Sequence, residues 1–212
     1  MVCILSVELN TLSWKTHIEE MLPKLCSACF AMKLLKPFVS QQMLKIIYYS
    51  YFHSIMSYGV IFWGHSSLGI KVYRLQKRII RIMTGSGNKD SCRKLFTSME
   101  ILPLPSQYIF LLLWFVIKYK DLFTTSDKFH NLCTRRHHNF HQPSVNLKKY
   151  QTGVYYMGIK IFICIYKKKE FTNSTNFVSL AKNFLCENSF YSLEEYFNFC
   201  TTYGLQYNVT EL

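Results

Sequence analysis

The sequence predicts a mainly α-helical fold, a helical bundle followed by a smaller helical tail, with a short strand around residues 3–7 as the one β element. Apolar residues recur at alternating spacings of three and four, which is typical of helices with one buried face. Proline, glycine and serine stand where these patterns begin and end. Half of the 212 residues are hydrophobic and 17% are aromatic, which supplies a core and argues against a disordered chain.

The first predicted helix begins after Ser13, whose hydroxyl can accept a hydrogen bond from a free N–H of the first turn. Because proline has no N–H and its ring clashes with the preceding turn, Pro23 is expected to kink or split this helix near residue 22. Pro37 ends it. The apolar stripe that predicts the helix consists of Ile18, Leu22, Leu25, Cys29, Met32 and Leu35.

A second helix is expected from Ser40, another capping residue, to Gly59 or Gly64. Its sequence is dense in aromatic residues between positions 48 and 63. Exposed aromatic rings can stack on nucleobases, but the helical spacing favours a packed core helix here. The face expected to be buried consists of Leu44, Ile47, Tyr51, Ile55 and Tyr58.

The third predicted helix runs from about residue 70 to Thr84 and ends at Gly85-Ser86-Gly87. At about 100° per residue, its side chains separate into two faces. The apolar face consists of Val72, Leu75, Ile79, Ile82 and Met83. The other face is basic, because Lys71, Arg74, Lys77, Arg78 and Arg81 fall within roughly a third of the circle.

The basic face carries one sign of charge, since no Asp or Glu occurs between Lys71 and Lys89. A solvated helix face usually mixes signs, with an acid three or four residues from each base. Two interpretations therefore stay open: a surface that contacts phosphates, and an exposed basic face without a partner. The five cations of this helix are the candidate nucleic-acid-binding residues.

The same kinds of signal predict the remaining elements, but the signals are weaker there. The apolar run at residues 108–117 is about half of the ~20 residues that span a bilayer, so it is expected to be a buried core helix. The sequence divides into a helical region at 1–121, a polar, histidine-rich loop or linker at 122–144, and a helical extension at 145–212. Further helices are expected near residues 91–99, 106–121, 147–165, 176–187 and 193–199, with a proline-rich connector at 102–105.

The charge balance favours a polyanionic partner. Lys and Arg number 25 against 12 Asp and Glu, giving a formal charge of +13. Such an excess attracts nucleic acid or an anionic membrane surface. The first residues lack the basic and apolar regions of a secretory signal, so a cytoplasmic or nuclear protein is expected, not a secreted one. The eight cysteines are accordingly expected to be reduced thiols, mostly buried.

The sequence offers no set of residues for catalysis. Two-metal chemistry needs converging carboxylates, but Asp90, Asp121 and Asp127 lie apart from one another near predicted loops or helix ends. The only adjacent acidic pairs are Glu19-Glu20 and Glu194-Glu195. No glycine-rich loop that could bind nucleotide phosphates is present. Cys26 and Cys29 have CxxC spacing without a second ligand pair, which favours a structural role. We therefore expect no catalytic residue, no metal site and no cofactor in this chain.

One denser cluster leaves a metal alternative open. Cys133, His137 and His141 have C-x3-H-x3-H spacing, with His138 beside them and His130 as a conceivable fourth ligand. Such residues can hold zinc if the segment forms a turn or a helix. The competing interpretation is a basic loop without metal.

Five segments together resemble one family: TLSWKTHIEEMLPKLCSACFAMKLLKPFVS (11–40), YYSYFHSIMSYGVIFWG (48–64), LQKRIIRIMTGS (75–86), DSCRKLFTSMEILPLPSQYIF (90–110) and FYSLEEYFNF (190–199). Their order and spacing resemble the part of jockey-like non-LTR retrotransposon reverse transcriptases that follows the catalytic palm. The resemblance covers about residues 9–199. It departs from the family at Glu8-Leu9-Asn10, where members usually carry an Asp, and at residues 163–166, where they tend to have an Asn-x-Leu-Pro turn. Both departures indicate a decayed or truncated copy.

The resemblance implies a parent protein with endonuclease and RNA-directed DNA polymerase activities. The family's metal-binding aspartates lie upstream in the palm, and nothing here matches them, so magnesium is expected only in the missing palm. The matched part resembles the helical thumb, residues 1–121, and its C-terminal extension. The implied partners are the palm and nucleic acid, as RNA template, RNA–DNA duplex or DNA duplex, and no membrane. The phosphate role of the five cations is inferred from residue type and not from a family motif.

These observations leave a leading hypothesis and competing ones. The leading hypothesis is a thumb-derived fragment that binds nucleic acid without sequence preference and has no enzymatic activity of its own. The alternative is a non-functional remnant that folds poorly without its palm and exposes an apolar patch. Two further hypotheses are a zinc-stabilised module around Cys133 and His141, and binding to a membrane surface by basic and aromatic residues.

Overall fold

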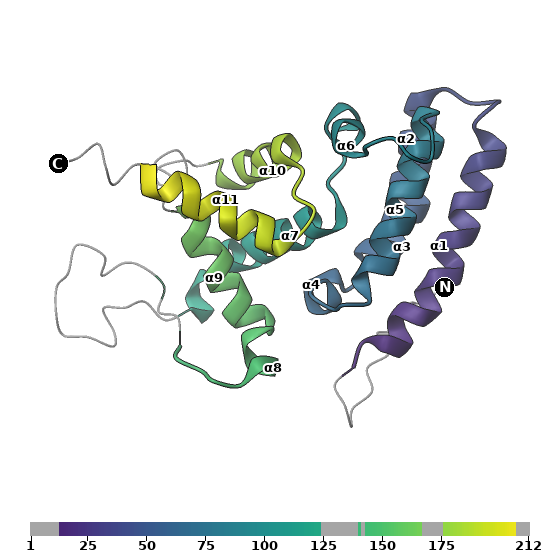
Figure 1. Ribbon diagram of the computed structural model, residues 1–212. Coiled ribbons are helices and arrows are strands. Elements are labelled where there is room, and N and C mark those ends of the chain that lie inside the picture. The colour runs from purple at the N-terminus through teal and green to yellow at the C-terminus, as the bar shows by residue number, and fades with distance from the viewer. Residues whose placement is uncertain (1–12, 124–139, 141–142, 167–175, 207–212) are drawn as a thin grey trace. The chain divides into compact units, whose positions relative to one another are not determined.

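The computed structural model describes residues 13–123, 140, 143–166 and 176–206 (Figure 1). Every regular element in these ranges is a helix, so the predicted mainly α fold is confirmed. The predicted strand at 3–7 lies outside the described residues.

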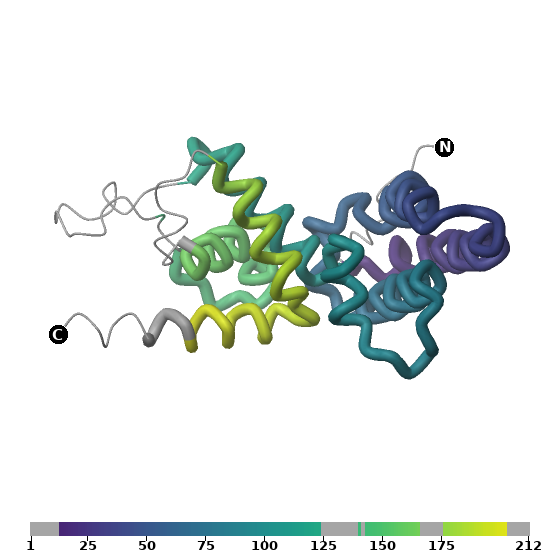
Figure 2. Tube along the Cα trace, turned by 90° about the horizontal axis from the view of Figure 1, so that it is seen from above, coloured from purple at the N-terminus to yellow at the C-terminus, as the bar shows by residue number. Residues whose placement is uncertain are grey.

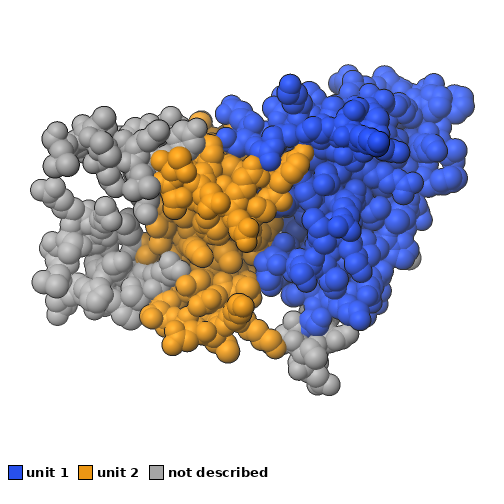
Figure 3. Space-filling model, in the orientation of Figure 1, with its two compact units in different colours: residues 1–107, 186–189 blue, residues 108–185, 190–212 orange. Residues whose placement is uncertain are grey.

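The chain forms two compact units (Figure 3). The first contains residues 1–107 and 186–189, and the second contains residues 108–185 and 190–212. Helix α7 (Leu104–Lys118) contributes residues to both. The sequence-based division at 121 and 144 stays a prediction.

Helix α1 (Lys15–Leu35) is continuous through Pro23, so the predicted split is wrong. Pro23 contributes no N–H to the helix, but Met21 and Leu25 on either side of it are both buried, which holds the two halves on one core. Ser13 accepts a hydrogen bond from the Lys15 N–H at 3.2 Å, but the N-cap residue of α1 is Trp14, which makes no side-chain capping bond, so the predicted Ser13 cap is wrong. Most of the predicted stripe is buried, whereas Leu35 at its end is 38% exposed.

The second helical segment consists of α2 (Gln41–Ile47), the π-helix η1 (Tyr48–His53) and α3 (Ser54–Ser57). Ser40 caps it by accepting a hydrogen bond from the Met43 N–H at 3.3 Å, which confirms the predicted start. The predicted buried face is wrong beyond Leu44. The side chains that are fully or almost fully buried are Leu44, Tyr48, Phe52 and Met56.

The π-helix explains this error. Three turns of α-helix take about 10.8 residues, and one extra residue brings the repeat close to the twelve that separate Leu44 from Met56. The buried positions therefore recur at every fourth residue. A face drawn with α-helical spacing turns away from the core, so that Tyr51 is 43% exposed.

Gly59 ends this segment with a positive φ of 62°, which confirms one of the two predicted stop positions. The short helix α4 (Val60–Trp63) follows. Trp63 is fully buried, and its Nε1–H donates a hydrogen bond to the Tyr58 carbonyl at 2.9 Å. Together with Tyr48 and Phe52, Trp63 confirms that the aromatic segment supplies core residues.

His17 of α1 lies among aromatic rings. Its ring centroid is 6.2 Å from that of Trp14, 6.4 Å from Tyr58 and 6.3 Å from Trp63. The side chain is 6% exposed, and its Nε2 has no hydrogen-bond partner. Burial lowers the pKa of His17 below its ordinary value of 6.5, although Glu20 raises it; Lys24 lowers it further.

The first unit is therefore expected to lose stability in acid. An unfolded His17 takes up a proton as the pH falls below about 6.5, whereas the folded one resists it, so protonation favours unfolding. One such group changes the free energy of unfolding by at most about 1.4 kcal/mol per pH unit. Urea denaturation at pH 7, 6 and 5 measures the slope of the free energy of unfolding against pH. His17→Phe should reduce it, and an unchanged slope would contradict this assignment.

Helix α5 (Gly69–Thr84) ends where the sequence predicts. Gly85 has a φ of 78°, and the N–H groups of Gly85 and Ser86 both donate to the Arg81 carbonyl, at 2.9 and 3.1 Å. This is the usual way for a helix to end at a left-handed glycine. Helix α6 (Arg93–Met99) follows after a short loop.

Gln76 of α5 is fully buried and connects three segments of the first unit. Its Nε2 donates hydrogen bonds to the Tyr48 hydroxyl at 3.0 Å and to the Leu102 carbonyl at 2.9 Å. Its Oε1 accepts from the Leu104 N–H at 2.8 Å, at the start of α7. The side chain thereby satisfies a helix-start donor that would otherwise lack a partner.

Helix α7 is a core helix, as predicted, because Tyr108, Ile109, Leu112, Leu113 and Val116 are all at most 1% exposed. It begins two residues earlier than expected, with Pro105 in the first turn, where no N–H is needed. Among the described residues, no single helix is both long and apolar enough to cross a membrane. The bent pair α6 and α7 passes that test when taken together.

In the residues that the structure describes, the second unit continues through the short 3-10 helix η2 and four further α-helices. One helix was expected at 147–165, but two form, because the chain turns at Thr152-Gly153. Gly158 allows close packing, since a Cβ there would lie 2.9 Å from the Val116 side chain. The bounds are η2 (Lys120–Leu122), α8 (Lys148–Gln151), α9 (Val154–Tyr166), α10 (Phe177–Asn188) and α11 (Leu193–Gln206).

Candidate nucleic-acid interface

Helix α5 presents its five cations on the side that faces solvent. Lys71, Arg74 and Arg78 are exposed, and Lys77 and Arg81 are partly buried. From Lys71 to Arg81 the helix rises about 15 Å, which equals the rise of roughly four phosphates of one strand measured along the axis of B-form DNA. The face thus has the charge and the length to follow a sugar–phosphate backbone. Its binding role stays a prediction.

Packing on the opposite side of α5 orients this face. Helix α5 packs against α1, α2 and α6. The predicted apolar residues Leu75 and Ile82 are only partly buried. Because α5 has contacts on both flanks, the centre of its buried side lies closer to α6 than predicted. On that flank the Tyr73 ring stacks on the Phe96 ring, with 6.3 Å between the ring centroids. The buried side chains are Val72, Tyr73, Gln76, Ile79, Ile80 and Met83.

Two of the five cations also have partners within the chain. The Lys77 ammonium lies 4.8 Å from the centroid of the Tyr73 ring. The Arg81 guanidinium donates to the Asp90 carbonyl from Nε at 3.2 Å and from Nη2 at 2.8 Å. The Asp90 carboxylate in turn accepts from the Gly87 N–H at 2.6 Å. Arg81 therefore closes the loop after α5.

No contact of this kind is described for the other three cations, Lys71, Arg74 and Arg78. In the parts of the chain that the structure describes, no carboxylate forms an ion pair with Lys71, Arg74 or Arg78. The described ion pair joins Lys45 to Glu100 at 3.4 Å. Phosphates could replace water at these three side chains without breaking an internal interaction.

Lys36, the residue directly after α1, extends the positive charge beyond the predicted set. Helices α1 and α5 lie side by side (Figures 1 and 2). A Cβ at Gly85 would lie 2.8 Å from the Lys36 Nζ, so Lys36 reaches the end of α5. The signal that the sequence prediction missed is the acid-free stretch, which runs from Glu20 to Asp90 and contains ten Lys and Arg.

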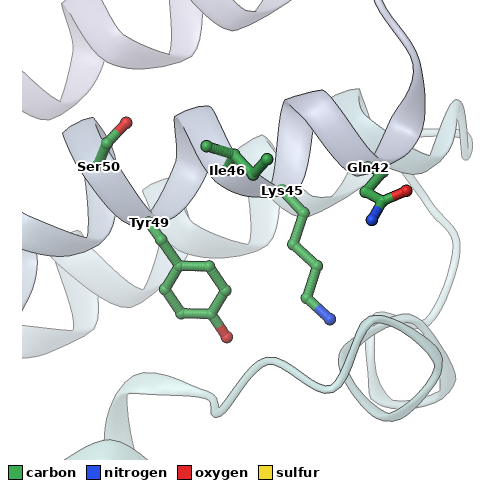
Figure 4. A pocket seen from close by; sticks show the side chains of 5 residues that line it. All are labelled: Gln42, Lys45, Ile46, Tyr49 and Ser50. Carbon is green, nitrogen blue, oxygen red and sulfur yellow. The ribbon is translucent and has the colours of Figure 1, made fainter.

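A separate depression lies on α2 and the π-helix (Figure 4). It has a volume of about 590 Å³ and is lined by Gln42, Lys45, Ile46, Tyr49 and Ser50. The Tyr49 hydroxyl donates to the Glu100 carbonyl at 3.4 Å. Burial raises the pKa of Tyr49, and the nearby Cys186 and Glu100 raise it further, which makes this hydroxyl a poor acid. The lining offers no pair of groups for proton transfer or nucleophilic attack.

The CxxC pair lies in the middle of α1, with Cys26 exposed and Cys29 buried. Burial raises the pKa of Cys29 to about 11, although Arg78 lowers it; Cys26 raises it further. A thiol that resists ionisation is a poor metal ligand, which favours the structural role. Among the described residues, no three His, Cys, Asp or Glu side chains form a group that could hold a metal ion. The cluster of Cys133, His130, His137, His138 and His141 lies outside them.

Glu195 of the acidic pair near the C-terminus has a structural role. Glu195 accepts a hydrogen bond from the Tyr191 N–H at 2.8 Å, and Ser192 accepts one from the Glu195 N–H at 3.1 Å. Together they cap the start of α11. Of the six described cysteines, Cys29, Cys92 and Cys200 are buried.

Comparisons of the chain with protein-family models, with curated proteins and with solved structures give no match.

Proposed function

We propose that this chain is a fragment of a jockey-like retrotransposon reverse transcriptase that binds nucleic acid without sequence preference and has no enzymatic activity alone. The observation that carries the binding proposal is the solvent-facing basic side of α5, where Lys71, Arg74 and Arg78 are exposed. The parent family rests on the sequence resemblance alone. Its palm would supply the catalytic carboxylates and would be the protein partner.

The chemistry of the face favours the backbone over the bases. Lys and Arg bind phosphate through charge, and displacement of the condensed counterions drives the association. Such contacts set position and affinity but carry no sequence information. RNA, DNA and hybrid strands are therefore all expected ligands of this face.

The proposal predicts a strong dependence of affinity on salt. If between three and five cations each contact a phosphate, log K should fall against log salt with a slope of about −2 to −4.5. Fluorescence anisotropy with oligonucleotides of mixed sequence, from 50 to 300 mM NaCl, measures it. A flat response would contradict phosphate contacts.

One observation favours the alternative of a non-functional remnant. Phe30 is 65% exposed, Leu34 56% and Phe38 84%, all near the end of α1. Exposed apolar side chains of this kind promote aggregation when nothing covers them. Size-exclusion chromatography and urea denaturation separate the two proposals. A soluble monomer that unfolds cooperatively supports the binding fragment, and aggregation at micromolar concentration supports the remnant.

A further inference from the structure

Phe30 stands on the surface of α1, and at 65% exposed it is much more accessible than its neighbour Cys29, which is 2% exposed. Cys29 marks the contact line between α1 and α5, because its Sγ lies 3.8 Å from the Leu75 carbonyl oxygen. Exposed residues of α1 next to Cys29 therefore lie on the surface beside α5.

Helical geometry places two exposed residues on that side. Lys33 lies about 40° and Phe30 about 100° around the helix from Cys29, in the same direction. Ala28 and Met32 lie in the opposite direction and are buried. The surface of α1 next to α5 thus carries a phenyl ring and an ammonium group, both facing solvent.

Helices α1 and α5 run in the same direction, so the residues of α5 that lie opposite Phe30 and Lys33 can be identified. Cys29 lies beside Leu75, and Lys36 beside Gly85, so α1 and α5 advance together. Phe30 and Lys33 then stand level with the part of α5 between Gln76 and Arg81. That part includes Arg78, whose charge acts on the Cys29 thiol.

From this juxtaposition we propose that the α1–α5 surface, formed by Phe30, Lys33, Lys71, Arg74 and Arg78, binds single-stranded nucleic acid in preference to duplex. The proposal rests on the proposed function and adds the kind of strand. The cations hold the backbone, and an unpaired base stacks on the Phe30 ring. In a duplex the bases are stacked on one another, so the ring has no partner there. A second copy of the chain is disfavoured as the occupant, because the surface would bring like charges together.

The test compares three probes: a single-stranded oligonucleotide, a hairpin duplex of the same net charge, and an abasic single strand of the same length. Phe30→Ala should weaken binding of the first about fivefold to tenfold, the lower part of the range for loss of one base–aromatic contact. Binding of the other two probes should be unchanged. Leu34→Ala, which removes exposed apolar surface from the same helix but no ring, is the matched control. Urea denaturation verifies that both variants fold like the wild type.

The outcomes separate this inference from the proposed function. If no probe binds, or binding ignores salt, the proposed function fails. If all three probes bind with strong salt dependence and Phe30→Ala weakens none of them selectively, only the single-strand inference is overturned. Equal losses in Phe30→Ala and Leu34→Ala would also overturn it, because they would show a general apolar effect. Restoration of single-strand binding by Phe30→Trp completes the expected result.

Discussion

Replacing Lys71, Arg74 and Arg78 together by glutamate is expected to lower the affinity for nucleic acid at least about 100-fold at ~0.1 M salt, because three phosphate contacts are lost and three repulsions replace them. The three side chains are exposed, so the fold should tolerate the change. Anisotropy titrations at a fixed salt concentration measure the effect. The slope of log K against log salt should also become shallower by about 2 to 3.

A matched variant separates the location of the charges from their number. Lys120, Lys148 and Lys182 are exposed residues of the second unit, and their replacement by glutamate also lowers the formal charge from +13 to +7. This variant should lose far less affinity. Equal losses in both variants would indicate attraction by net charge alone, and would remove α5 as the interface.

Gln76→Leu is expected to reduce the free energy of unfolding by at least about 3 kcal/mol, the largest effect on stability that we predict for one substitution. Leucine fills a similar volume but cannot form hydrogen bonds. The Tyr48 hydroxyl, the Leu102 carbonyl and the Leu104 N–H all bond to Gln76. Each buried polar group left without a partner costs about 1 to 3 kcal/mol. Against a typical stability of about 5 to 15 kcal/mol, the loss is large.

Urea denaturation followed by Trp fluorescence measures this change. Gln42→Leu is the control, because Gln42 is an exposed glutamine of α2 and its replacement should be nearly neutral. Tyr48→Phe removes only one of the three partners, and Gln76 can still donate to Leu102, so its effect should be smaller. A Gln76→Leu variant as stable as the wild type would show that the buried network contributes little.

Local signals in the sequence were enough to predict parts of this fold and its candidate site. The end of α5 follows from Gly85, and the start of α2 from the Ser40 cap, because both depend on residues a few positions apart. The basic arc of α5 follows from spacing within one helix. The burial of the apolar run in α7 follows from its composition and its length.

The features that the sequence did not predict depend on contacts between different elements of the chain. A glutamine usually lies at the surface. Gln76 is buried because it forms hydrogen bonds with Leu102 and Tyr48, which lie 26 and 28 positions away in the sequence. Arg81 is tied to Asp90 only because the loop after α5 closes. Lys36 joins the basic surface through the packing of α1 on α5. No spacing rule within one element contains these relations.

The π-helix between Tyr48 and His53 gives this segment one residue more than an α-helix with the same number of turns would have. Removal of one exposed position there, such as Ser50, would let ordinary i→i−4 bonding run through the segment. Leu44 and Met56 would then be eleven positions apart, close to three full α-helical turns, and would still point to the same side. A three-nucleotide loss from the coding sequence is therefore expected to be tolerated better here than in α1 or α5, where it would rotate one half of the helix out of register.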